Sequence, residues 1–166
     1  VQRRNRQIAT EKIARHQIKG IINVVTYGYN NVEENEIANI FSNDPVPNVK
    51  ESYLTINRNA EITQLSEWME FIHNGCGVEC VITVITKADI WNKNKEEVMS
   101  YYQHGQYYTR CTEKISRVCH TCVYPYCSII SPFGEKPMLL SFSERDKQKL
   151  HKEFKEELFK IIRHEY

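Results

Sequence analysis

The stretch Cys80-Val-Ile-Thr-Val-Ile-Thr-Lys-Ala-Asp89 carries the strongest indication of the fold in this chain. Its first six residues are apolar or β-branched without interruption, which is typical of a strand buried on both faces of a parallel sheet. Its last four residues place a hydroxyl, an ammonium and a carboxylate directly after that strand. Ligands of open parallel sheets bind at the carboxyl ends of the strands. The stretch therefore predicts a central strand followed by a binding loop.

Helices and strands alternate on both sides of this stretch. Apolar residues at helical spacing predict helices over 5–19, 51–73 and 95–108, and a last helix from Ser143, whose pairing with Asp146 resembles a capping box. Two more apolar runs predict strands over 21–27, buried on both faces, and over 123–130. Pro125 lacks an N–H for the ladder, so the third strand belongs at a sheet edge. This alternation predicts an α/β fold with three layers, α-β-α, around a mostly parallel sheet.

Composition limits the class of protein. The chain has 166 residues, of which 41% are hydrophobic and 26% charged, so we expect one globular domain over 1–166, with a long polar loop over 30–50. The formal net charge of +1 argues against a protein that binds nucleic acid through phosphate contacts. No apolar run reaches the roughly 20 residues that span a bilayer, and the start shows no signal-peptide pattern. We therefore expect no membrane span and a cytoplasmic location.

Thr86-Lys87-Ala88-Asp89 resembles the guanine-specificity motif of the P-loop GTPase superfamily, Asn-Lys-x-Asp, of which Thr-Lys-x-Asp is a variant. The later order is also similar: a helix, a strand, a second loop with Ser128 and Ile129 where the family has a Ser-Ala motif, and a long closing helix. The resemblance covers nearly all of this chain and corresponds to the C-terminal portion of a GTPase domain, without its N-terminal strands. Residues 20–29 also resemble an uncharacterised bacterial branch of the P-loop GTPase superfamily.

The resemblance implies that the chain binds GTP or GDP, and each residue type suits that role. Guanine offers two N–H donors on one edge, which a carboxylate such as Asp89 accepts as a bidentate, charge-assisted pair. The stem of Lys87 can lie on the purine face. Thr86 would tie down a neighbouring loop. The hydroxyl of Ser128 and the N–H of Ile129 would approach the guanine carbonyl.

Two motifs of the superfamily are missing from the chain: Gly-x-x-x-x-Gly-Lys-Ser/Thr, which cradles phosphates, and Asp-x-x-Gly on the magnesium side. Without them the triphosphate has no site. Because Val1 opens directly into a charged, helix-like stretch, we expect the chain to be the C-terminal part of a longer protein. Mg²⁺ binding and GTP hydrolysis are then expected only if the missing motifs lie upstream of Val1.

Two other functions stay open. The first is a pseudo-GTPase, an interaction module that keeps the fold, binds a protein partner of unknown identity and does not turn over nucleotide. The second is a small zinc-binding protein: Cys119 and Cys122 have C-x-x-C spacing, Cys76 and Cys80 could form a second pair, and His73 or His120 could contribute. The simpler expectation for the six cysteines is that they are reduced thiols packed as small apolar groups.

Overall fold

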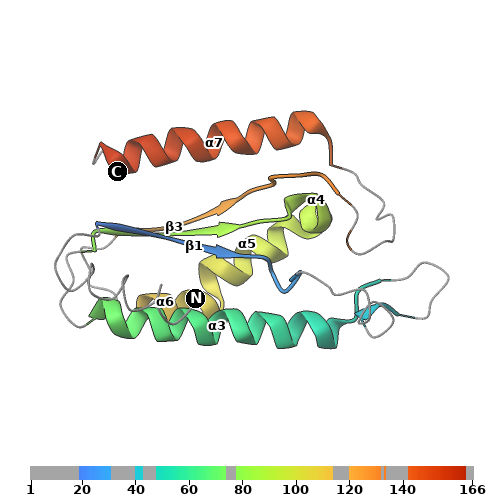
Figure 1. The fold of residues 1–166 in the computed structure, drawn as a ribbon, viewed down its shortest axis with the longest axis horizontal. Helices are drawn as coiled ribbons and strands as arrows, with labels where there is room; N and C mark the ends of the chain where they lie inside the picture. Colours follow the sequence, from blue (N-terminus) through green and yellow to red (C-terminus); the bar gives the residue numbers. More distant parts are fainter. Residues whose placement is uncertain are drawn as a thin grey trace, which may run out of the picture.

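The computed structural model describes residues 19–30, 40–42, 48–73, 78–113, 120–131, 133 and 142–163 (Figure 1). The helix predicted over 5–19 lies outside these residues apart from Lys19. Most of the polar loop predicted over 30–50 also lies outside them, although Phe41 and Val49 form an isolated antiparallel bridge within it.

Three parallel strands form the sheet: β1 (Gly20–Val25), β2 (Cys80–Ile85) and β3 (His120–Pro125), in the order β1-β2-β3. Gly20 pairs with Cys80 and Cys80 with His120, so the three strands start level with one another. The predicted α/β class with a parallel sheet is confirmed. Every residue of β2 is buried, as predicted for the central strand. The strand that contains Pro125 lies at an edge of this sheet, which also confirms the prediction.

Helices cover both faces of the sheet (Figure 1). One face carries α7 (Glu144–Ile162), and the other carries α3 (Glu51–His73), α5 (Lys95–His104) and α6 (Gln106–Thr112). The short helices α4 (Ala88–Trp91) and η2 (Asn92–Asn94) follow β2 directly. The larger core lies between the sheet and the α3 side. Its most deeply buried side chains are Leu65, Met69, Val81, Ile85, Val98, Tyr102 and Tyr107.

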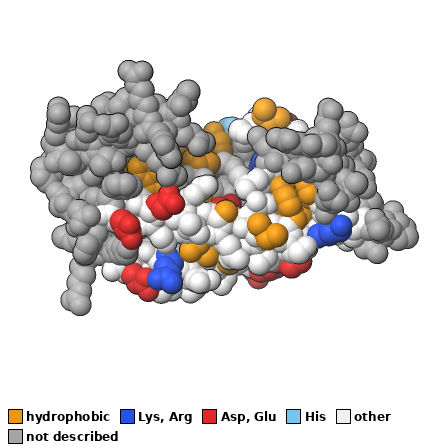
Figure 2. All heavy atoms as spheres, turned by 60° about the horizontal axis from the view of Figure 1, so that its bottom comes forward, with side chains coloured by type: hydrophobic (Ala, Val, Ile, Leu, Met, Phe, Trp, Pro, Cys, Tyr) orange, Lys and Arg blue, Asp and Glu red, His pale blue; other side chains and the backbone are white. Residues whose placement is uncertain are grey.

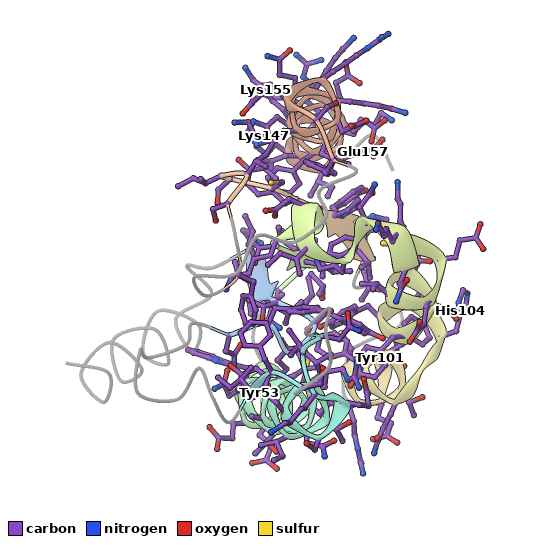
Figure 3. The ribbon with its side chains drawn as sticks, turned by 90° about the vertical axis from the view of Figure 1, so that its right-hand side faces the viewer. Tyr53, Tyr101, His104, Lys147, Lys155 and Glu157 are labelled. Atoms are coloured by element: carbon purple, nitrogen blue, oxygen red, sulfur yellow. The ribbon has the colours of Figure 1, made fainter. Side chains whose placement is uncertain are left out.

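Local sequence signals set the ends of two helices as predicted. The structure confirms a helix over residues 51–73. At the start of α7, the Ser143 hydroxyl accepts a bond from the Asp146 N–H at 3.3 Å, and the Asp146 carboxylate accepts one from the Ser143 N–H at 2.9 Å. This is the predicted capping box, in which the side chain of each residue accepts a bond from the backbone N–H of the other. Figure 3 looks along α7 and shows Lys155 and Glu157 on opposite sides of it.

The prediction that the first strand is buried on both faces is wrong. Ile22 and Val24 of β1 are 50% and 60% exposed. The cause is that α7 packs over β2 and β3, where Leu158 and Ile161 meet apolar side chains of both strands. One helix is about as wide as two strands, so α7 covers β2 and β3 and leaves β1 uncovered.

Three predicted boundaries are also wrong. The strand predicted over 21–27 spans Gly20–Val25, because the chain turns at Tyr27, whose φ is 55°. The third strand was predicted over 123–130, but it spans His120–Pro125, because its pairing follows the extent of β2, from Cys80 opposite His120 to Ile85 opposite Pro125. The helix predicted over 95–108 is two helices, α5 and α6, since the backbone becomes extended at Gly105.

The surface of the described residues carries mixed charge. Figure 2 views the molecule from the α3 side, and acidic, basic and apolar side chains are interspersed over the described part of that face. Among the described residues, no helix is both long and apolar enough to cross a membrane.

Candidate functional site

The predicted binding loop starts where β2 ends, and Thr86 ties it to the neighbouring strand. The Thr86 N–H and hydroxyl both donate to the carbonyl of Val25, the last residue of β1, at 2.8 and 3.1 Å. The Trp91 indole N–H donates to the Thr86 carbonyl at 2.7 Å, which ties the last residue of α4 back to the start of the loop. Both groups of Thr86 therefore bond to the end of β1.

Lys87 reaches the same segment with its side chain. Its backbone is left-handed, with φ 59° and ψ 38°, a conformation that is uncommon for a residue other than glycine. Its Nζ donates to the Tyr29 carbonyl at 2.6 Å and lies 5.2 Å from the centre of the Phe133 ring. Burial lowers the pKa of the Lys87 ammonium, and the nearby Asp89 carboxylate partly opposes this shift. The ammonium is thus held between a carbonyl oxygen and an aromatic face.

Asp89 joins the loop after β2 to the loop after β3. It is 5% exposed, and its two carboxylate oxygens accept one bond each: Oδ1 from the Cys127 thiol at 3.4 Å and Oδ2 from the Ser131 N–H at 3.1 Å. Burial raises the pKa of the Cys127 thiol to about 11, with a further contribution from the Asp89 charge, so Cys127 is a neutral donor. The structure therefore brings the two predicted loops together through Asp89.

Ser128 and Ile129 lie on the loop between Cys127 and Ser131, and both are exposed, Ile129 by 70%. The contacts with Asp89 come instead from Cys127 and Ser131, the residues that flank them. The predicted contact of Ser128 and Ile129 with a guanine carbonyl stays a prediction.

The loop after β3 is anchored to α7. The Tyr126 ring stacks on the His151 ring with centres 4.6 Å apart, and His151 Nε2 lies 2.6 Å from the Cys127 carbonyl oxygen. His151 of α7 therefore holds Tyr126 and Cys127, the two residues after β3, whereas Asp89 belongs to α4. Through Cys127, the Asp89 carboxylate is thus connected to α7.

A buried carboxylate that the sequence analysis missed shapes the other side of the site. Glu61 of α3 is 8% exposed. Its Oε1 accepts from the N–H groups of Thr26 and Gly28 at 2.9 and 3.2 Å, and its Oε2 accepts from the Tyr102 hydroxyl at 2.6 Å. Tyr27 and Gly28 both have positive φ, 55° and 82°. Glu61 therefore holds the sharp turn after β1, the turn that leads to the carbonyl that binds Lys87.

The sequence did carry a signal for Glu61. It stands seven residues after Leu54 and four before Leu65, on the apolar line of the helix, and both of those residues are buried. A charged residue in a core position of an amphipathic helix is expected to have buried partners. Tyr29 and Phe133, which contact Lys87, carried no comparable signal because their loops have no periodic pattern.

A hydrophobic cluster, which we call the Phe133 cluster, packs next to Lys87. Phe133 is 4% exposed, and its ring meets those of Tyr29 and Phe41 with centres 5.4 and 6.1 Å away. The cluster consists of Ile40, Phe41 and Phe133, with Tyr29, Val49, Tyr53 and Ile90 packed against it. Tyr53 projects from α3 and donates to the Asn30 carbonyl at 3.4 Å (Figure 3).

A separate hollow lies at the opposite, amino end of the strands. It has a volume of about 610 Å³ and is bordered by the starts of β1 and β2 and the end of α7. Its lining is mostly aliphatic: Ile21, Ile22, Ile82, Leu158, Ile161 and Ile162. Lys19 and Glu79 form an ion pair at its rim, with N and O 2.6 Å apart.

The described cysteines are free thiols packed in the protein. Cys80, Cys111 and Cys127 are buried and Cys122 is partly buried. Burial raises the pKa of the Cys122 thiol to about 11 and also raises the pKa of Cys80, which opposes formation of the thiolates that zinc needs. Among the described residues no group of three His, Cys, Asp or Glu side chains could hold a metal ion. Cys76, Cys119 and the side chain of His73 lie outside those residues.

The loop after β2 is tied to both neighbouring strands or their loops by polar bonds within the protein. The Thr86 hydroxyl bonds to the end of β1, the Lys87 ammonium to the loop after β1, and the Asp89 carboxylate to the loop after β3. Comparison of the chain with protein-family models, with curated proteins and with solved structures finds no match.

Proposed function

We propose that this chain is the guanine-recognition portion of a P-loop GTPase-like domain and binds the base of GTP or GDP. The observation that carries the proposal is the position of Thr86-Lys87-Ala88-Asp89. It directly follows the buried central strand of a parallel sheet, and the Asp89 carboxylate faces the loop that follows the next strand. Residues at the carboxyl ends of adjacent parallel strands are where an α/β sheet binds its ligand.

The chemistry of the two charged groups fits a guanine. The Asp89 oxygens already accept two donors from the loop after β3, so this carboxylate is oriented to accept a pair of donors on one side. Guanine presents such a pair, whereas adenine lacks it and cannot replace the two donors that Asp89 already has. Lys87 already lies near an aromatic ring face, and a purine offers another. Asp89 is the base anchor in this proposal and Lys87 the stacking side chain.

The test compares GMP with AMP, which differ only in the base. A titration followed by the amide NMR signals of residues 86–89 and 127–131 detects weak binding. We expect GMP to shift these signals and to bind at least about tenfold more tightly than AMP, since a lost donor pair on a buried carboxylate costs several kcal/mol. Asp89→Asn should abolish this preference, while Glu96→Gln, an exposed carboxylate on α5, should leave it unchanged. Equal binding of the two nucleotides, or no shift with either, would contradict the proposal.

The bond network around Asp89 also favours the second candidate, a pseudo-GTPase that binds a protein partner. Asp89 is almost fully buried and has internal partners on both oxygens, as expected of a structural carboxylate. In that case Asp89→Asn should lower the melting temperature while GMP causes no signal shift in either variant. The same titration therefore separates the two functions.

Hydrolysis of GTP requires phosphate and magnesium ligands that the chain does not contain. The coding sequence upstream of Val1 tests this part of the proposal. If it encodes Gly-x-x-x-x-Gly-Lys-Ser/Thr after an apolar strand, we expect slow, Mg²⁺-dependent GTP hydrolysis by the encoded protein. If it does not, the function is limited to binding.

A further inference from the structure

We propose that Phe133 and Ser131 cap the guanine site from within, so that the loop after β3 occupies the base position until a nucleotide displaces it. This inference rests on the proposed function and concerns the regulation of the same site. It comes from two contacts within the structure, one on each of the charged residues of the loop after β2.

The first contact covers Lys87. The Phe133 ring centre lies 5.2 Å from Lys87 Nζ, within the distance of a cation–π interaction. A purine stacked on Lys87 would use the same attraction, because the Phe133 ring and the purine both offer an aromatic face to the ammonium. The ring and the base therefore compete for one position. Burial also lowers the pKa of the Lys87 ammonium.

The second contact occupies Asp89. The Ser131 N–H donates to Oδ2 at 3.1 Å, and the Cys127 thiol donates to Oδ1 at 3.4 Å. These are two donors on one carboxylate, the same pattern that the guanine edge would supply. Ser131 stands two residues before Phe133, so a single short segment provides both the aromatic face and one of the donors.

Packing holds the cap closed. Phe133 is 4% exposed and lies in contact distance of the Tyr29 and Phe41 rings. The Tyr29 carbonyl accepts the Lys87 ammonium at 2.6 Å, so the loop after β1 is part of the closed arrangement. A nucleotide must displace this segment before it binds, and its apparent affinity is lower by the fraction of molecules that are open.

The cap makes an unusual prediction: loss of a buried contact should raise affinity. The test is an NMR titration of GMP into the wild-type chain and into the Phe133→Leu and Phe133→Ala variants. Phe133→Leu removes the π face but keeps apolar bulk, and a cation–π contact of about 1 kcal/mol corresponds to roughly fivefold tighter GMP binding. Phe133→Ala also removes the obstruction and should bind GMP more tightly still. AMP should gain little in either variant, because Asp89 finds no donor pair on adenine.

The matched control is Phe142→Leu, since Phe142 is 6% exposed and belongs to a different part of the core. It should destabilise the fold to a similar degree without changing GMP affinity. Thermal melting of each variant confirms that the titrated protein is folded.

The outcomes separate the two proposals. If the wild type prefers GMP over AMP but the Phe133 variants bind GMP no more tightly, the site is real and the cap is wrong. If affinity rises equally in Phe142→Leu, a general loosening explains the gain and the cap is again wrong. If no folded variant binds GMP, guanine recognition fails and the cap fails with it.

Discussion

The two ends of the sheet differ in what they offer to a ligand. At the carboxyl ends, Glu61, Lys87 and Asp89 are charged groups with short internal bonds. At the amino ends, β1 and β2 border an aliphatic hollow of about 610 Å³ whose charged groups form an exposed ion pair on the rim. One end has ordered polar groups closed over by their own loops, and the other has open space with little polar chemistry. Open volume and oriented polar groups therefore occur at opposite ends of this sheet, and the proposed guanine site lies at the polar end.

The largest effect is expected at the carboxyl end, from Glu61→Ala. The substitution leaves the N–H groups of Thr26 and Gly28 and the hydroxyl of Tyr102 without their acceptor. Buried groups that lose their partner cost about 1–3 kcal/mol each, so we expect a loss of about 3 kcal/mol or more. Urea unfolding measures it, with the exposed Gln64→Ala on the same helix as the control. A loss below about 1 kcal/mol would show that the turn after β1 does not depend on Glu61.

A pair of glycine substitutions compares the two ends directly. Gly28 at the carboxyl end has φ 82°, and a Cβ there would lie 2.6 Å from the Leu54 carbonyl oxygen, which is backbone. Gly20 at the amino end would place its Cβ 2.6 Å from the Cys80 sulfur, a side-chain atom that can rotate away. We expect Gly28→Ala to cost about 2–3 kcal/mol from strain and Gly20→Ala about 1 kcal/mol or less. Urea unfolding of both variants tests the order, which a larger cost for Gly20→Ala would reverse.

Alkaline pH should weaken the loop after β3. The pKa of the Cys127 thiol is raised from its ordinary value of 9.0 to about 11 in the folded protein. The unfolded chain therefore loses this proton first, so the contribution of Cys127 to stability is complete below pH 9 and falls as pH rises toward 11. Unfolding measured from pH 8 to 11 should show this decline, and Cys127→Ala should reduce its slope. An unchanged slope in Cys127→Ala would assign the decline to other groups, such as Cys122 and the buried tyrosines.

The smallest effect is expected at the amino end, from Lys19→Ala. The Lys19–Glu79 ion pair has exposed side chains, 66% and 40%, and such pairs contribute about 0–1 kcal/mol. Unfolding at low and at high salt should show little difference between the variant and the wild type. A loss that approaches that of Glu61→Ala would remove the contrast between the two ends.

The sequence predicted the parts of the fold that local patterns encode. The unbroken apolar run of β2, the apolar spacing of residues 51–73 and the Ser143–Asp146 pair each specify their element without distant contacts. The boundary of β3 and the exposed face of β1 were wrong because both depend on a neighbour: the length of β2 ends β3, and the position of α7 leaves Ile22 exposed. Periodicity within one segment contains no information about the extent of its partner.

The candidate site shows the same division. Thr86, Lys87 and Asp89 stand together in the sequence, so their motif and their position after a strand were visible. Cys127 and Ser131 were not identified as the partners of Asp89, and Phe133 was not identified as a partner of Lys87, because these contacts join loops far apart in the chain. Sequence reasoning thus found the polar residues of one loop and missed their partners on other loops.

The register of the sheet has a consequence for how fast the molecule folds. Gly20 pairs with Cys80 and Cys80 pairs with His120, so each strand pair closes a chain segment of about 60 or 40 residues, and a short hairpin cannot nucleate this sheet. Entropy is lost on closing such loops before any strand contact is gained. We therefore expect α7, with its capping box and its i,i+3 and i,i+4 ion pairs, to form before the strands assemble. Newly synthesised chains should then spend a measurable period with β2, the most apolar segment of the sheet, open to solvent and in need of protection from aggregation.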